Sequence, residues 1–395
     1  MRNVGTVVRG IRTPIIKEND KLEDIVIQSL LDARESEGFE FRDRDVVAIT
    51  EAVVGISEGN YCSVDDIATD IKERFNNPDE LGIVFPILSR NRFSLILKGI
   101  ARSTKKLYVQ LSFPSDEVGN GILDEDKLEN SAFNLTSVIS EEDYNKVFGD
   151  FIHPFTGINM ISFYRDLIKE QGCEPIFVLA NNPLEILKYT TNVINCDIHT
   201  RVKTKKLLEN KGAKVVGLFE IMNHSINGSG YNEKYGLLGS NKSTEERLKL
   251  FPKDGQRLVE NIQRRLKEIS GKNIEVMVYG DGAFKDPVGK IWELADPVVS
   301  PFYTSGLEGT PNEIKLKFVS DNKFPDLHGD ELKNAIKEEI RKKDADLKGQ
   351  MITQGTTPRR LTDLIGSLCD LTSGSGDKGT PVVFIQGYFD NLSDE

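Results

Sequence analysis

Residues 274–290 read Ile-Glu-Val-Met-Val-Tyr-Gly-Asp-Gly-Ala-Phe-Lys-Asp-Pro-Val-Gly-Lys, a β-branched run followed by a glycine turn that carries an aspartate. The run predicts a short strand over 274–278, and Gly280 and Gly282 predict a turn around Asp281. Asp286 follows five residues later. A carboxylate on a glycine turn at a strand end is well placed to hold a hard metal ion beside phosphate. An ordinary Asp-Gly surface turn fits the same residues and stays open as the alternative.

Length and composition predict a globular chain with roughly two domains, or one core with a large insertion. The chain has 395 residues, of which 38% are hydrophobic and 29% are charged. No uninterrupted apolar run approaches the ~18 residues that a membrane span needs. The net charge of -11 argues against nucleic acid as a general partner. The four cysteines are scattered without C-x-x-C spacing and no apolar signal region is seen, so we expect a reducing cytoplasm.

Two segments near the N-terminus have strands that lead into turns. Val4 to Val8 is the first predicted strand, ended by Gly10-Ile11-Arg12-Thr13-Pro14, and a helix is predicted from about Leu22 to Ala33. A second, buried strand over 45–50 leads into the glycine-punctuated segment 51–60. Such a junction is a common place for ligand contacts in α/β proteins, and also an ordinary turn.

The middle of the chain alternates strand-like runs with helical stretches between residues 105 and 220. Runs over 107–111, 175–180 and 214–219 predict strands. Further on, 330–348 predicts a charged and mostly solvated helix.

A third feature is the segment Gly236-Leu-Leu-Gly-Ser-Asn-Lys-Ser-Thr-Glu-Glu246. It resembles a phosphate-binding loop, but Asn241 stands where that loop needs its second glycine, and we reject this interpretation. Ser243 with Glu246 instead predicts a capping box and a helix start, and an anion can bind at a helix N-terminus.

A fourth feature is a small-residue loop near the C-terminus, between a helix predicted over 357–371 and a strand that begins near Pro381. The loop reads Ser373-Gly374-Ser375-Gly376-Asp377-Lys378-Gly379-Thr380. It exposes many backbone N–H groups and suits nucleotide phosphates, although helix-to-strand connections often contain Gly and Ser.

No covalent catalytic signature is visible, and the four histidines share no metal-ligand spacing. Asp197 and His199 could present two ligands on one strand face, but we expect a hydrogen-bonded structural pair. No catalytic residue is assigned.

Taken in order, these segments resemble the coenzyme F-420 gamma-glutamyl ligase family. The resemblance lies in Gly10 to Ile16, Asp45 to Gly59, Ser240-Asn241, Val278 to Asp281 and, most closely, Asp363 to Gly387. It covers roughly residues 4–100 and 225–387, so that the chain divides into an N-terminal part of the core (1–104), an inserted α/β segment (105–224) and a C-terminal part of the core (225–395).

The resemblance implies an α+β fold with mixed sheets, and a homodimer. It implies a ligase that uses GTP (or ATP) and Mg or Mn to join L-glutamate to a small-molecule carboxylate through an acyl phosphate. It implies Asp281 as a metal ligand, and Asp286 is the candidate second ligand, as a substitute for a family ligand that this chain lacks. The nucleotide would meet residues of four segments: Gly10, Ile11, Arg12, Thr13, Glu51, Asn241, Ser373, Gly374, Ser375, Gly376, Asp377, Lys378 and Gly379.

The chain also departs from the family pattern at metal- and phosphate-binding positions. These positions hold Leu238, Gly282, Ser375 and Ile56 in this chain. The departures motivate an alternative, a catalytically degenerate protein that binds a small molecule or a partner on the same fold. A ligase acting on an unrelated substrate, with the insertion reshaping its acceptor pocket, is a third hypothesis.

Overall fold

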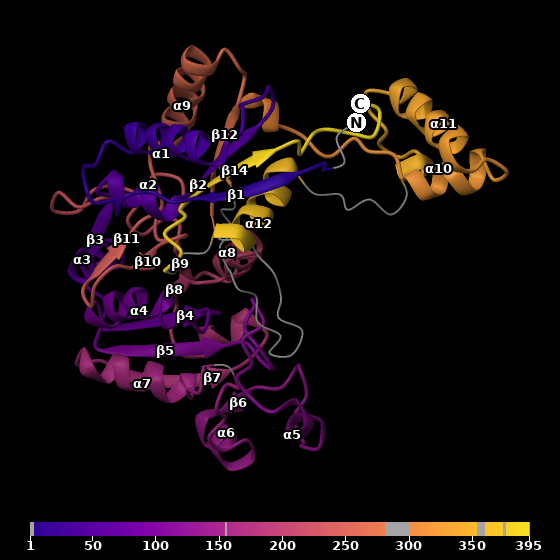
Figure 1. Cartoon of the computed structure of the whole chain (residues 1–395). Coiled ribbons are helices and arrows are strands. Elements are labelled where there is room, and N and C mark those ends of the chain that lie inside the picture. The colour runs from indigo at the N-terminus through magenta and orange to yellow at the C-terminus, as the bar shows by residue number, and fades with distance from the viewer. Residues whose placement is uncertain (1–3, 155, 281–299, 354–359, 374–376, 395) are drawn as a thin grey trace.

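The computed structural model describes residues 4–154, 156–280, 300–353, 360–373 and 377–394. Within them the chain forms two bodies, each built on one of the larger sheets, and a smaller helical lobe (Figure 1). Both larger sheets combine parallel and antiparallel pairs, and helices cover them. The predicted α+β class with mixed sheets is confirmed.

The first body is built on a five-stranded sheet, here sheet A. Its order is β1(Val7–Ile11), β14(Val382–Gln386), β2(Val46–Thr50), β12(Glu275–Tyr279) and β13(Phe302–Tyr303). Only β2 and β12 run parallel, and the first strand of the chain pairs with the last. The predicted first strand lies three residues further on, because Gly10 and Ile11 pair with Val383 and Val382.

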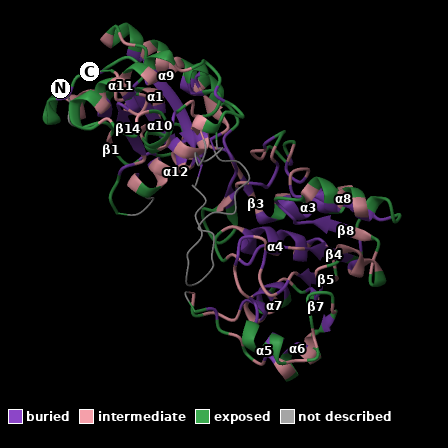
Figure 2. Ribbon diagram, turned by 90° about the vertical axis from the view of Figure 1, so that its right-hand side faces the viewer, coloured by how far each residue is buried: buried purple, intermediate pink, exposed green. Residues whose placement is uncertain are grey.

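Helices cover both faces of sheet A. Alternate residues of each strand therefore enter two different cores. Val47 and Ile49 of β2 pack with α1(Leu22–Glu37) and α9(Gly255–Ser270) on one face. Val46 and Ala48 pack with α12(Leu361–Ser373) on the other. The central strands are buried in the view of Figure 2.

The second body contains a six-stranded sheet, here sheet C. Its order is β6(Ile139–Ser140), β7(Glu174–Leu179), β5(Lys106–Leu111), β4(Glu80–Val84), β8(Asn192–Asn195) and β9(Lys214–Gly217). All pairs except β6–β7 are parallel. From β4 the strands β5 and β7 follow on one side, and the chain then returns to add β8 and β9 on the other side of β4. One face is covered by α3(Val64–Phe75), α4(Phe93–Arg102) and α7(Met160–Glu170), the other by η1(Pro183–Lys188) and α8(Arg201–Glu209). Strand β4 comes from residues before 105.

A small antiparallel sheet, sheet B, joins the two bodies. Its order is β10(Asn241–Lys242), β11(Arg247–Lys249) and β3(Tyr61–Ser63). The prediction that a helix starts at Ser243 is wrong. Residues 243–246 instead form the turn of a hairpin, in which the N–H groups of Ser243 and Thr244 donate to the Arg247 carbonyl. Pairing with β3 buries Leu248, and that tertiary contact overrides the local capping pattern.

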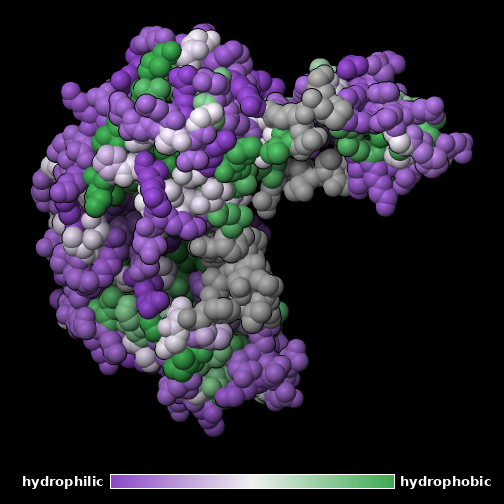
Figure 3. Space-filling view, in the orientation of Figure 1, coloured by the Kyte–Doolittle hydropathy of each residue, from purple (hydrophilic) through white to green (hydrophobic). Residues whose placement is uncertain are grey.

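The smaller lobe contains α10(Leu316–Lys323) and α11(Gly329–Lys342), which has the predicted solvated character. It has its own apolar cluster, separate from those of the sheets. Its outer surface is mostly hydrophilic (Figure 3). The remaining described helices are short: α2(Glu51–Ser57), α5(Glu125–Glu129), α6(Glu141–Val147), η2(Ser305–Leu307) and η3(Met351–Thr353). None of the described helices combines the length and apolarity that crossing a membrane requires.

Candidate functional site

Four segments singled out in the sequence meet at one edge of sheet A. Strands β1, β2 and β12 end there and β14 begins there, because Ile11 pairs with Val382 and Thr50 with Tyr279. Backbone hydrogen bonds continue beyond the strands. The Thr13 N–H donates to the Gly379 carbonyl at 3.2 Å, and the Thr50 N–H donates to the Pro381 carbonyl at 2.9 Å.

A cavity of about 940 Å³ lies along the outer edge of β1. Its volume is in the range of small-molecule and cofactor sites. The lining comes from the end of β1, from α1 and from the C-terminal loop: Arg9, Gly10, Ile11, Arg12, Thr13, Pro14, Ser29, Asp32, Ala33, Ser36, Glu37, Thr372, Lys378 and Thr380. The predicted nucleotide residues from 10–13 and Lys378 therefore share one cavity.

The charges in this cavity come from different elements. Arg12 and Lys378 are exposed cations on the strand end and the loop, whereas Asp32 and Glu37 belong to α1. Arg9 is held more firmly, because its guanidinium donates to Gln386 at 2.9 Å and lies 4.7 Å from the Phe39 ring centroid. One side of the cavity can thus attract an anionic group.

The C-terminal loop is tied to sheet A at its beginning. The hydroxyl oxygens of Ser373 and Tyr279 are 2.5 Å apart, and the Thr380 hydroxyl donates to the Ser373 carbonyl at 3.1 Å. Burial raises the pKa of Tyr279, so this phenol stays neutral and can share its proton with Ser373. Gly374, Ser375 and Gly376 lie outside the described residues, while Asp377 and Gly379 are exposed.

Glu51 and Asn241 come together through a residue that the sequence analysis missed. The Lys249 ammonium lies 2.5 Å from a carboxylate oxygen of Glu51, the first residue of α2. Asn241 is the direct cross-strand partner of Lys249 in the hairpin. The signal available in the sequence was a lysine inside the apolar run 248–251, where an unpaired charge would be costly.

Gly55 makes room for this arrangement. It lies one turn after Glu51 on α2, and a Cβ atom there would stand 3.0 Å from the Leu250 carbonyl oxygen and 3.3 Å from Cδ of Lys249. The aliphatic stem of Lys249 therefore crosses α2 at the glycine, and its ammonium reaches Glu51.

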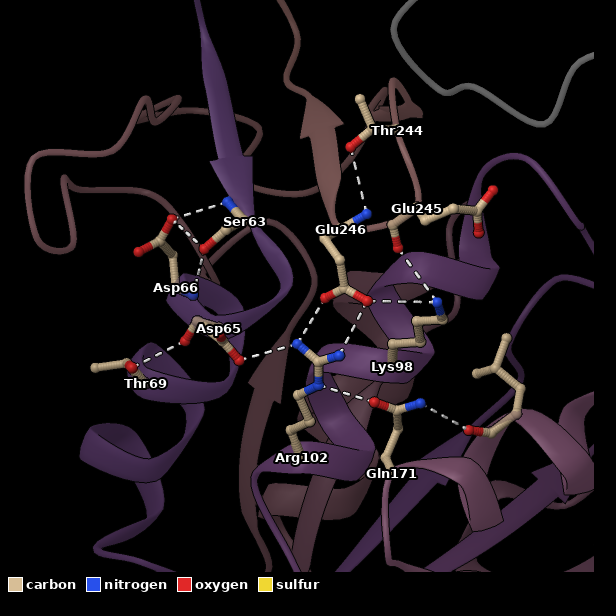
Figure 4. Close-up of polar contacts among 11 residues, drawn as sticks. Ser63, Asp65, Asp66, Thr69, Lys98, Arg102, Gln171, Thr244, Glu245 and Glu246 are labelled. Carbon is tan, nitrogen blue, oxygen red and sulfur yellow. Dashed lines mark hydrogen bonds and ion pairs between the residues drawn. The ribbon is translucent and has the colours of Figure 1, made fainter.

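The other end of the hairpin is anchored to α3 and α4 (Figure 4). Arg102 pairs with Glu246 at 2.7 Å and with Asp65 at 3.0 Å, and Lys98 donates to the Glu245 carbonyl at 3.2 Å. The hairpin is thus fixed at its turn by one group of charges and at its base by the pair of Glu51 and Lys249.

The predicted metal ligands Asp281 and Asp286 lie outside the described residues. In the described ranges no group of three or more His, Cys, Asp or Glu side chains could hold a metal ion. Asp197 and His199 do not bond each other. Asp197 accepts from Thr200, and His199 lies 3.1 Å from Glu117, whose hydrogen bond raises the pKa of the imidazole.

Comparison with known proteins gives one broad match. A protein family described as F420-0:Gamma-glutamyl ligase matches residues 10–387. No curated protein matches the chain. Among solved structures, the crystal structure of eIF2B beta from Chaetomium thermophilum aligns with 42% of this chain at 12% identity and a TM-score of 0.23. The alignment spans only 43% of that protein's chain, and a likeness at this level carries no argument.

Proposed function

This chain belongs to the F420-0:gamma-glutamyl ligase family, and from that premise we propose that it is a nucleotide-dependent ligase that forms an amide bond between a small-molecule carboxylate and L-glutamate. The observation that supports the proposal is the cavity beside β1, in which residues 10–13 meet Lys378 and Thr380 of the C-terminal loop. Its volume of about 940 Å³ suits GTP or ATP, and Arg12 and Lys378 supply positive charge for phosphates.

The proposed chemistry has two steps. The carboxylate of the acceptor attacks the terminal phosphoryl group of the nucleotide, which leaves an acyl phosphate and a nucleoside diphosphate. The amine of glutamate then attacks the acyl carbon, loses a proton and expels inorganic phosphate. Both steps depend on groups that position the reactants and spread phosphoryl charge. The cations Arg12 and Lys378 of the cavity are suited to that work.

Dependence on Mg or Mn is part of the proposal. Its candidate ligands are Asp281 and Asp286, which follow β12 in the sequence. The described residues alone offer no complete set of metal donors, so no step is assigned to a metal ion. We also propose that the protein is a homodimer. We further propose that residues 105–224 are a segment inserted into the ligase-like core.

The decisive experiment is calorimetric titration of the purified protein with GTP and with ATP, with and without Mg or Mn. We expect metal-dependent binding that Asp281→Ala weakens, followed by nucleotide-dependent consumption of L-glutamate when carboxylate acceptors are screened. As a control, Asp394→Ala near the C-terminus removes an exposed carboxylate away from the cavity. Absence of nucleotide binding under every condition would refute the ligase.

The second candidate is a protein that binds a ligand on the same fold without catalysing ligation. It is favoured by the engagement of Glu51 with Lys249 and of Ser373 with Tyr279, since these groups already have partners. This candidate predicts nucleotide or metabolite binding without release of inorganic phosphate. Phosphate release that requires both glutamate and an acceptor would exclude it.

A further inference from the structure

The ion pair of Lys249 and Glu51 is buried where β2 ends and α2 begins. The side chains are 6% and 3% exposed, and they join strand β11 to helix α2. Removing two charges from water is costly, and a well-packed apolar pair in such a place is often at least as stable. Stability alone therefore gives no reason for a lysine and a glutamate at these positions.

The Lys249 ammonium has capacity for further hydrogen bonds. A lysine carries three N–H donors, and within the described part of the chain the ammonium donates only to Glu51. Asn241 projects from the facing position on β10, and directly opposed residues have Cβ atoms about 5 Å apart. Two polar side chains thus stand together beside the first residue of α2.

A third polar group lies next to them in the chain. Ser240 is 3% exposed, and its hydroxyl oxygen has no hydrogen-bond partner in the residues that the structure describes. A buried hydroxyl without a partner is unfavourable, and native structures rarely keep one without a reason. A ligand that brings an oxygen beside Glu51 would satisfy the remaining donors of the Lys249 ammonium.

The place where Glu51 and Lys249 pair adjoins the strand ends that border the cavity. Thr50 precedes Glu51 and donates to the Pro381 carbonyl, and Pro381 follows Thr380 of the cavity lining. A ligand that occupies the edge of sheet A can therefore contact residues of both regions.

We propose that Lys249 binds an oxyanion of the ligand, and that Glu51 is the counter-ion that holds the ammonium until the oxyanion arrives. The oxyanion is a phosphate of the nucleotide or the carboxylate of the amino-acid substrate. This inference rests on the proposed function, because it assumes that such a ligand binds at this edge. Asn241, which faces Lys249 across the hairpin, supplies a neutral hydrogen-bonding group to the same oxyanion.

The test compares two single variants whose effects on affinity should differ in sign. Lys249→Met removes the ammonium and should weaken binding of the oxyanion by about tenfold or more, as expected for a charged hydrogen bond. Glu51→Gln removes the competing carboxylate and should strengthen binding, and unchanged affinity in this variant would overturn the proposal. Calorimetry would use GTP, ATP, L-glutamate and inorganic phosphate as separate probes. A loss confined to nucleotide and inorganic phosphate identifies a phosphate, and a loss confined to glutamate identifies the carboxylate.

A structural role for the pair predicts a different result. Both single variants would then bind more weakly in proportion to their loss of stability, and a folded Glu51→Gln with weakened binding would overturn the proposal. The double variant Glu51→Gln/Lys249→Met leaves no unpaired charge, which protects folding if Lys249→Met alone unfolds. It should bind as weakly as Lys249→Met, and wild-type affinity in the double variant also overturns the proposal.

The matched control is Lys205→Met, which removes a lysine that pairs with Glu220 at 2.6 Å in the other body. Its affinities should equal those of the wild type. If the wild type binds none of the probes, the proposed function itself fails. If the wild type binds and Lys249→Met binds equally well, the inference alone fails.

Discussion

At the residue scale, the buried carboxylate of Asp116 makes the stability of the fold depend on pH. Its carboxylate is buried at the carboxyl end of sheet C and accepts hydrogen bonds from the N–H groups of Leu88, Val118 and Asn120. Burial raises its pKa from 3.8 to about 6, against the opposing effect of these hydrogen bonds. Desolvation therefore outweighs hydrogen bonding at this carboxylate.

The raised pKa of Asp116 predicts how stability depends on pH. Between about pH 4 and 6 the folded chain binds more protons than the unfolded chain, so its stability falls as pH rises through this window and is level above it. The contribution is on the order of 3 kcal/mol, from about two pKa units. Asp116→Asn should remove it, as urea unfolding at a series of pH values would measure. The pKa of Asp45 is also raised to about 6. The wild type and Asp116→Asn should therefore share the part of the pH dependence of stability that comes from Asp45.

The site residues that the sequence could identify are those with a local signature. Gly10 to Thr13 and Lys378 stand in turns at strand ends, and the structure places them on one cavity. Lys249 stands out in the sequence only as a charge inside an apolar run, and its partner Glu51, 198 positions away, cannot be identified from that run. Only the packing of β11 against α2 shows that the two charges meet.

At the element scale, the contact of α2 with β11 depends on a glycine. Gly55→Ala should lower the free energy of unfolding by about 1–3 kcal/mol, because the added methyl group meets the Leu250 carbonyl oxygen at 3.0 Å. The backbone on both sides of that carbonyl is held, since the Leu250 N–H donates to the Asn60 carbonyl and the Phe251 carbonyl accepts from the Asn60 side chain. The gain in helix propensity, up to about 1 kcal/mol, offsets only part of this loss. Chemical denaturation would measure the change. Gly121→Ala is the control, because its Cβ would meet only ordinary contacts at 3.7 Å or more.

The hairpin of β10 and β11 illustrates why element type was mispredicted. Ser243 and Glu246 carry the spacing of a helix cap, but the backbone of Ser243 bonds to Arg247 across a turn. A capping box contributes locally, whereas burial of Leu248 and the ladder to β3 depend on residues far away in the chain. Tertiary contacts decided the outcome.

The charges at the hairpin turn give a prediction of modest size. Arg102→Met removes the pairs with Asp65 and Glu246, which are largely exposed, so we expect a loss of about 1 kcal/mol or less. The loss should shrink at high salt, because exposed charges are screened. Urea unfolding of wild type and variant at low and high ionic strength would measure it. A larger loss that does not depend on salt would show that the packing of the arginine stem matters more than its charge.

At the scale of the whole molecule, the sequence predicted strand order along the chain better than strand pairing in space. Its alternating runs located β5, β7, β9 and β14 to within a few residues. Strand β14 is inserted between β1 and β2, more than 300 residues earlier, and no local pattern encodes that pairing. The family resemblance supplied the α+β class that propensities alone left open.

The lobe of α10 and α11 provides the last prediction, because its core is separate from those of the sheets. Its buried residues, including Val319, Ile336 and Ile340, pack with one another. The lobe leaves and rejoins the body at neighbouring points, since the Leu361 N–H donates to the Gly309 carbonyl at 3.0 Å.

A short Gly-Ser linker can therefore replace residues 310–360 without moving α12. Among the described residues, those that line the cavity beside β1 all lie outside the lobe. We expect the shortened protein to unfold cooperatively by circular dichroism and to bind nucleotide as the full chain does. A shortened protein that folds and loses nucleotide affinity would instead assign the lobe to the ligand site.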